Sequence, residues 1–176
     1  MIKKKRNKSY LLNLLAVALF FLFINTLYAQ PGLPQREITV IPTQPIDFGT
    51  FYVTGAGSIK VDFQGNVSTT GGVVSVDNST VTPAIFEIKL CQGRTVTLNN
   101  VYSVNINGSN GGQLELLIGE AKRDGLGDVL INGSSFPVDT NCTFTTIIRA
   151  GGTLIVPANA VQGVYIGSFP LTFTQQ

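Results

Sequence analysis

Short segments in which apolar and polar residues alternate recur about every ten residues over most of the chain. In residues 58–63, for example, Ile59, Val61 and Phe63 fall on one face and the polar residues between them fall on the other. Successive side chains of a β-strand point to opposite faces of a sheet, so this alternation predicts half-buried strands. Beyond residue 29 no segment repeats apolar residues at helical spacing over three turns. The sequence therefore predicts an all-β fold.

The predicted strands are separated by turns rich in Gly, Asn and Asp. They cover residues 37–41, 46–53, 58–63, 67–70, 73–76, 85–90, 95–98, 101–106, 114–118, 129–131, 144–149, 153–156 and 163–174. Short strands at this spacing are typical of a two-sheet sandwich. We therefore expect a single immunoglobulin-like or fimbrial-like β-sandwich over residues 46–176.

The two ends of this predicted domain carry more specific expectations. Residues 30–45 contain four prolines, which confine this extended leader to a sheet edge or to solvent. Residues 158–162 allow one short helical turn. The last segment is expected to place its large apolar side chains on one face: Tyr165, Phe169, Leu171 and Phe173.

The first 29 residues have the order of a secretory signal peptide. Five of the 12 Lys and Arg residues lie within the first eight positions, and an apolar run of about 14 residues follows them. This run is shorter than the roughly 20 residues of a membrane-spanning helix. We expect cleavage between Ala29 and Gln30, with an uncleaved N-terminal anchor as the alternative. Residues 1–29 are thus expected to be a signal peptide, and the mature chain to be secreted, periplasmic or on the cell surface, with no membrane span.

Removal of the signal peptide would reverse the sign of the net charge. The whole chain has a formal charge of +2, but residues 30–176 hold seven basic residues against all ten acidic ones, a balance near −3. A basic balance would have favoured a nucleic-acid partner. The mature charge does not, and we expect no nucleic-acid binding.

The chain has two cysteines, Cys91 and Cys142. Exported proteins enter an oxidising compartment, so a single disulfide between them is the expected state. Two separate buried thiols are the alternative, because bonding geometry cannot be read from sequence.

Two segments resemble the exported bacterial domain of unknown function 4402. The opening segment, residues 45–51, contains Asp47, Phe48 and Gly49. The closing segment, residues 151–169, contains Gly152, Thr153, Leu154, Pro157, Ala158, Asn159, Gly163, Tyr165, Gly167 and Phe169. Little matches between Cys91 and residue 143. The resemblance implies a β-sandwich similar to fimbrial subunits and other surface proteins, and it implies no established activity. We interpret both motifs chiefly as features of the fold.

The residues that most enzyme mechanisms require are missing. The chain has no His, which excludes Ser-His-Asp and Cys-His arrangements and removes the commonest ligand of transition metals. No Walker A loop and no dinucleotide-binding glycine motif is present. We therefore expect a protein that is not an enzyme and that carries no cofactor and no metal.

Carboxylates are the remaining route to chemistry, because glycosidases need only a pair of them. The ten carboxylates are scattered, and Asp62, Glu87 and Glu115 alternate with apolar residues, so these three are expected to face solvent. Asp124 and Asp128 lie in a Gly-containing segment that calcium could use. The segment lacks the ligand spacing of a known calcium loop, and a solvated turn explains it better.

These observations leave binding or assembly as the expected function. The leading hypothesis is a surface structural module that pairs strands with another chain or a second copy of itself, with residues 36–41 as a candidate donor strand. Those residues are more simply the first strand of their own sheet. The second hypothesis is an adhesin or carbohydrate-binding module, in which Tyr52, Tyr102 and Tyr165 stack against sugars.

Overall fold

The computed structural model describes residues 37–90, 94–100, 102–125, 129–130, 132–139 and 145–176, all within one compact unit. The predicted signal peptide with its Ala29–Gln30 cleavage site, the start of the leader, Cys91, Cys142 and Asp128 lie outside these residues. The predicted all-β fold is confirmed, since the described residues contain strands and turns and no helix. The structure accordingly offers no helix of the length and apolarity that crossing a membrane requires, among the residues it describes.

Twelve strands are present in this described part of the chain. They are β1 (Thr39–Gln44), β2 (Thr50–Val61), β3 (Val67–Asp77), β4 (Ala84–Lys89), β5 (Thr95–Asn100), β6 (Ser103–Gly108), β7 (Gln113–Arg123), β8 (Val129–Leu130), β9 (Ser135–Pro137), β10 (Thr146–Val156), β11 (Tyr165–Ile166) and β12 (Leu171–Gln175). Their named pairings are all antiparallel.

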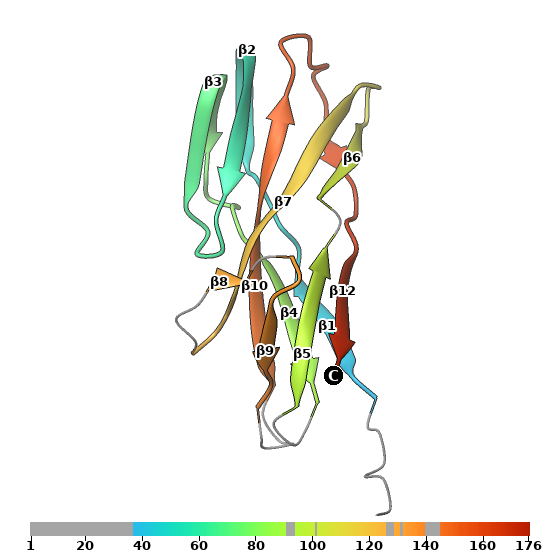
Figure 1. The fold of residues 1–176 in the computed structure, drawn as a ribbon. Helices are drawn as coiled ribbons and strands as arrows, with labels where there is room; N and C mark the ends of the chain where they lie inside the picture. Colours follow the sequence, from blue (N-terminus) through green and yellow to red (C-terminus); the bar gives the residue numbers. More distant parts are fainter. Residues whose placement is uncertain (1–36, 91–93, 101, 126–128, 131, 140–144) are drawn as a thin grey trace, which may run out of the picture. The chain divides into compact units, whose positions relative to one another are not determined.

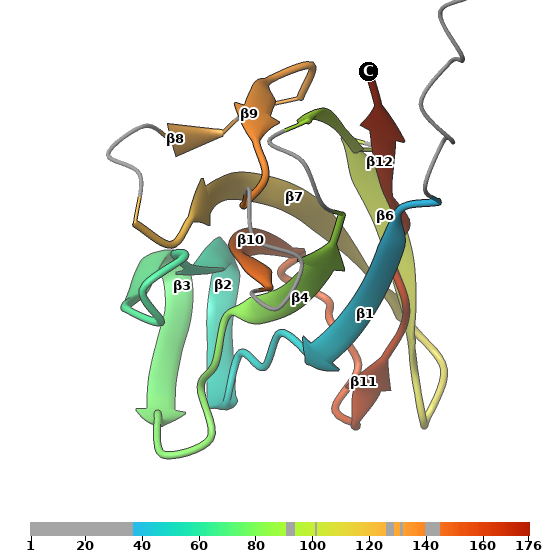
Figure 2. The same ribbon diagram turned by 90° about the horizontal axis from the view of Figure 1, so that it is seen from below.

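The strands form two sheets, as expected of a sandwich (Figure 1). The larger sheet runs in the order β1-β4-β10-β7-β6-β11, with β2 added to β10, β3 added to β2, and β8 added to β7. The smaller sheet has the order β12-β5-β9. Figure 2 shows that the larger sheet curls into a half-barrel.

Strand β10 lies at the centre of the larger sheet because it pairs with three other strands. One edge of β10 pairs with β7 along most of its length. Its other edge pairs first with β4, from Thr146 to Ala150, and then with β2, from Gly152 to Val156. The register shifts between Ala150 and Gly152, so a β-bulge marks the point where β10 changes partner.

Two apolar clusters fill the interior. One lies between the two sheets and includes Phe136 of β9, Leu98 of β5 and Ile148 of β10. The other lines the curled part of the larger sheet and includes Ile59 of β2 and Leu154 of β10. Phe169 packs against both clusters. Burial of this apolar surface is the main force that holds such a fold together.

Three details differ from the expectations. The segments around β2, β3 and β10 were each predicted as two strands, but Thr50–Val61, Val67–Asp77 and Thr146–Val156 are single strands with register shifts along them. The last segment is not one strand, because β11 belongs to the larger sheet and β12 to the smaller one. Residues 157–160 form a β-turn, in which the Ala160 N–H donates to the Pro157 carbonyl at 3.1 Å, and not a helical turn.

Candidate functional site

The opening motif holds the loop that leads into β2. The Asp47 carboxylate accepts a hydrogen bond from the Gly49 N–H at 2.7 Å, and the Asp47 backbone exchanges hydrogen bonds with Thr82 at 2.9 and 3.2 Å. Gly49 has a φ of +69°, which side-chain-bearing residues rarely adopt. Phe48 packs against the core of the curled sheet. Each of these residues thus has a turn or packing role.

The closing motif forms the β10 bulge and the crossing between the sheets. A Cβ on Gly151 would lie 2.5 Å from the Val61 carbonyl oxygen, so β2 can approach the bulge only where a glycine stands. Thr153 pairs with Lys60, and Leu154 is buried. A Cβ on Gly167 would collide with the Ile106 side chain where the chain leaves the larger sheet.

Tyr165 fixes the loop between β10 and β11 to the β6–β7 turn. Its ring lies against the backbone of Gly108, and its hydroxyl donates to the Val161 carbonyl. The Val164 N–H donates to Ser109 Oγ at 3.1 Å, and the Asn110 side chain donates to the Gln162 carbonyl at 2.9 Å. These hydrogen bonds tie residues 161–165 to the β6–β7 turn, and the motif residues Pro157, Ala158, Asn159 and Gly163 are exposed on the same loop.

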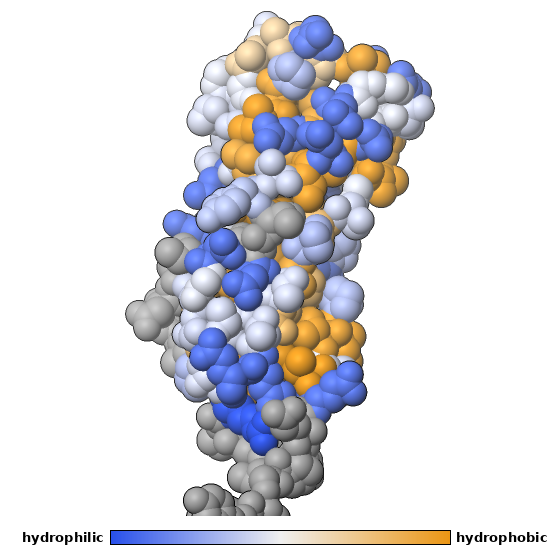
Figure 3. Space-filling view, turned by 45° about the vertical axis from the view of Figure 1, so that its right-hand side comes forward, coloured by the Kyte–Doolittle hydropathy of each residue, from blue (hydrophilic) through white to orange (hydrophobic). Residues whose placement is uncertain are grey.

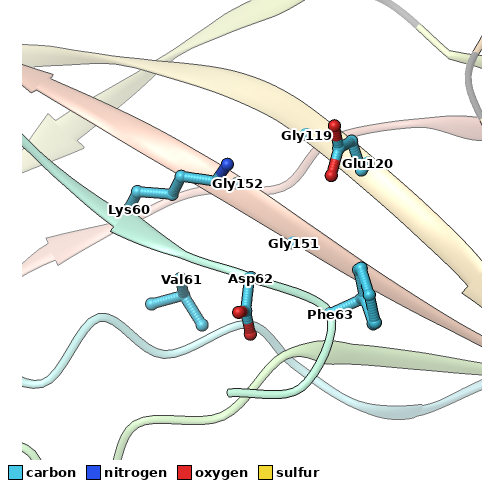
Figure 4. A pocket seen from close by; sticks show the side chains of 8 residues that line it. All are labelled: Lys60, Val61, Asp62, Phe63, Gly119, Glu120, Gly151 and Gly152. Carbon is cyan, nitrogen blue, oxygen red and sulfur yellow. The ribbon is translucent and has the colours of Figure 1, made fainter. Parts of the chain in front are cut away.

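A shallow depression lies where β2, β7 and β10 meet (Figure 4). It is lined by Lys60, Val61, Asp62, Phe63, Gly119, Glu120, Gly151 and Gly152. Its volume of about 10 Å³ is at the lower limit for a single water molecule, so it is too small for a sugar or a cofactor.

Two carboxylates, Asp62 and Glu120, line this depression. Asp62 Oδ1 accepts hydrogen bonds from the Gln64 and Asn66 N–H groups at 2.8 and 2.9 Å, and Oδ2 accepts one from the Asn66 side chain at 2.8 Å. Partial burial opposes ionisation of Asp62, but these hydrogen bonds outweigh it and hold its pKa below the ordinary value of 3.8. Asp62 therefore stays ionised as the cap of the β2–β3 turn. Glu120 is exposed.

The structure also describes the surroundings of the other carboxylates considered in the sequence, except Asp128. Glu115 is exposed as expected, whereas Asp62 and Glu87 are half-buried. Asp124 Oδ1 accepts a hydrogen bond from Arg149 Nε at 3.0 Å, so an arginine already occupies this carboxylate. Among the described residues no three Asp, Glu, Cys or His side chains gather to hold a metal ion.

The three tyrosines do not form one stacking platform. Tyr52 lies on β2, Tyr102 immediately before β6, and Tyr165 on β11. Strands β10 and β7 lie between β2 and β6, which separates Tyr52 from Tyr102 by roughly 14 Å across the sheet alone. Tyr165 pairs with Gly108, about 20 Å along β6 from Tyr102. Tyr52 and Tyr102 are exposed individually.

The most extended unpaired feature is the outer edge of β3, which sequence reasoning did not single out. β3 pairs with β2 on one side and, in the described structure, with no strand on the other. Figures 1 and 2 both show it at the margin of the larger sheet. No residue from Val67 to Val76 is charged, and none is proline. The uncharged run is visible in the sequence, but the Gly71–Gly72 pair within it led to a prediction of two short strands, residues 67–70 and 73–76.

The other edges of the two sheets are short or protected. β8 and β11 have two residues each, and β9 has three, of which one is Pro137. β1 contains Pro42, which has no N–H to offer a new strand. β12 has five residues. β3, with 11 residues, is the longest edge strand in the described structure, and it is bent, because Gly71 has a φ of +63° and the register against β2 shifts beside it and again near Asp77.

Exposed apolar side chains adjoin the free edge of β3. Val74 and Val76 point outward on β3, and Tyr52 is the cross-strand partner of Val74 on β2. A second apolar group, made up of Val161, Val164 and Ile166, lies on the loop before β11 and on β11 itself. Figure 3 shows apolar side chains gathered among polar ones on the upper part of the molecule, where this loop and β6 lie.

Comparison with known proteins gives one match. Residues 38–174 match the family described as Domain of unknown function (DUF4402). No curated protein matches the chain, and no solved structure does either.

Proposed function

The chain belongs to the DUF4402 family, and from that premise we propose that its domain is a non-enzymatic structural module that joins another polypeptide by strand addition at β3. The observation that carries the proposal is the free edge of the 11-residue strand β3, which is uncharged from Val67 to Val76 and carries one charged residue, Asp77, at its end. A strand edge of this kind offers a row of backbone donors and acceptors to an incoming chain. Main-chain hydrogen bonds then supply affinity, and alternate side chains supply specificity.

The proposal includes export of the protein from the cytoplasm. The N-terminal sequence supports a signal peptide cleaved after Ala29, and the composition supports a secreted or cell-surface protein. The finer likeness to an immunoglobulin-like or fimbrial-like sandwich belongs here too, supported by the two antiparallel sheets. A fimbrial-like subunit that polymerises through strand pairing combines these features.

Site-specific photocrosslinking in the cells that make the protein tests strand addition at β3. A photoreactive residue in place of Val76 should give a covalent adduct of one discrete size. The same residue in place of Val164 is the matched control, since the two valines are 63% and 65% exposed. Absence of an adduct at position 76, or equal adducts at both positions, would contradict the proposal.

An adhesin is the second candidate, and the loop before β11 favours it. Val161, Val164 and Ile166 are exposed beside the polar groups of Asn110 and Gln162, a mixture that suits a sugar with one apolar face. A glycan array should then show binding that Ile166→Asp abolishes and Val76→Lys leaves intact. No binding at high protein concentration would exclude this candidate.

A further inference from the structure

The outer face of the smaller sheet, formed by β12, β5 and β9 (Figure 1), has no charged residue. In the larger sheet, by contrast, β2, β4, β7 and β10 each contain at least one. Leu98, Phe136 and Phe173 belong to the core between the sheets, so the alternate residues of their strands point outward. Apart from Pro137, these outward residues carry hydroxyl or amide groups: Thr95, Thr97, Asn99, Ser135, Thr172 and Thr174.

Hydrogen bonds between strands hold part of this polar face in place. Thr97 Oγ1 and Ser135 Oγ share a hydrogen bond of 2.8 Å, and the Gln176 side chain donates to Thr97 Oγ1 at 2.8 Å. Threonine is β-branched, so its side chain is also stiff about χ1. A ligand that binds to side chains already held in this way costs them little conformational entropy.

An exposed tyrosine lies just beyond the end of β5. Tyr102 is 77% exposed, and its Cα is at most about 11 Å from that of Asn99, three residues earlier. The Asn132 side chain donates a hydrogen bond to the Tyr102 hydroxyl at 3.3 Å. The next residue, Gly133, donates its N–H to the Leu98 carbonyl of β5 at 2.8 Å. The turn that precedes β9 therefore holds the tyrosine beside the smaller sheet.

We propose that this face, together with Tyr102, binds a neutral polysaccharide. A charged ligand would lose hydration there without gaining an ion pair, so the uncharged face favours an uncharged ligand. Hydroxyl and amide groups donate and accept hydrogen bonds, which matches the hydroxyl groups of sugars. The tyrosine ring adds a surface for the apolar side of a sugar ring. An open sheet face makes few contacts with each sugar unit, so it suits an extended chain of sugars better than a single one.

The proposed surface is separate from the two sites discussed above. It belongs to the smaller sheet, whereas β3 and β11 lie at the edges of the larger one. Binding of a polysaccharide there therefore requires neither strand addition at β3 nor a sugar on the loop before β11.

Affinity electrophoresis of the purified protein tests the proposal. Native gels are cast with dextran, a β-glucan, a xylan or a galactomannan as neutral polysaccharides, and with alginate as an anionic one. At least one neutral polysaccharide should retard the protein, and alginate should not. Tyr102→Ala should raise the dissociation constant by about tenfold, because the stacking surface is lost. Thr174→Val should raise it by about threefold, because one hydroxyl group is lost while the β-branched shape is kept.

Matched control variants lie on the larger sheet. Tyr52→Ala, at a tyrosine that is 52% exposed, and Thr69→Val, at an exposed threonine of β3, should leave retardation unchanged, and near-UV circular dichroism should show that every variant is folded. Retardation by no neutral polysaccharide would overturn the inference, as would equal losses in Tyr52→Ala and Tyr102→Ala. Loss of retardation in Ile166→Asp but not in Tyr102→Ala would move the sugar to the loop before β11 and overturn it too. None of these results decides strand addition at β3, which crosslinking at position 76 tests by itself.

Discussion

Gly49 occupies a backbone conformation and a space that only glycine fits. Its φ is +69°, and an added Cβ would collide with the Asp77 carbonyl oxygen and lie 2.9 Å from Val81 Cγ2. Gly49→Ala should therefore lower the free energy of unfolding by about 2 kcal/mol or more. Gly111→Ala is the control, since Gly111 has a φ of +82° but no atom within 4 Å of an added Cβ. Equal losses in urea denaturation would show that the conformation alone, and not the collision, matters.

The ionisation of Asp62, at the β2–β3 turn, makes the stability of the fold depend on pH. Because its pKa is lower in the folded protein than in the unfolded chain, its ionised form stabilises the fold above the unfolded value of 3.8. That contribution is lost as pH falls from about 5 through the folded-state pKa. Asp62→Asn should therefore flatten the loss of unfolding free energy between neutral and acidic pH. Urea titrations of the wild type and of the variant over this pH range measure the difference.

At the level of strands, alternation predicted most of the elements but not their continuity. Residues 151–152 resembled a turn because they are two glycines, yet in β10 they form a bulge inside one strand. β9 was missed because Ser135, Phe136 and Pro137 are too few to show a period. The crossing from β11 to β12 was missed because alternation does not report which sheet a strand joins.

The candidate site was harder to predict than the fold. The uncharged run of β3 is visible in the sequence, but its free edge depends on strand order. Strand order arises from long-range pairings such as β10 with β2, which no local pattern encodes. The motif residues were interpreted as features of the fold, and Gly49, Tyr165 and Gly167 have turn and packing surroundings consistent with that interpretation.

The short strand β9 should matter more for stability than its length suggests. Phe136 is 1% exposed and lies in the cluster between the two sheets. Phe136→Ala should lower the free energy of unfolding by about 3–5 kcal/mol, since it leaves a cavity where the sheets meet. Tyr102→Ala, at a side chain 77% exposed, should stay within about 0.5 kcal/mol of wild type in the same urea titration.

For the molecule as a whole, the predicted disulfide would join the chain shortly after β4 to the chain shortly before β10, two strands that pair with each other. Ile88 and Thr146 are paired across these strands, three residues before Cys91 and four after Cys142. Replacement of both cysteines by alanine should lower the free energy of unfolding by about 4 kcal/mol in the chain-entropy model. Alkylation of the protein unfolded in urea without a reductant, followed by mass spectrometry, should label neither cysteine. Full labelling would contradict the bond.

The central position of β10 determines when the other strands of the larger sheet can pair during folding. β2 and β4 both need β10 as a neighbour, but about 85 residues separate the end of β2 from the start of β10. Ladders between such distant segments form slowly, because a long loop must close before any contact is gained. The larger sheet therefore stays open until the C-terminal part of the chain is available. A polypeptide that closes its larger sheet this late stays unfolded for longer while it is being synthesised.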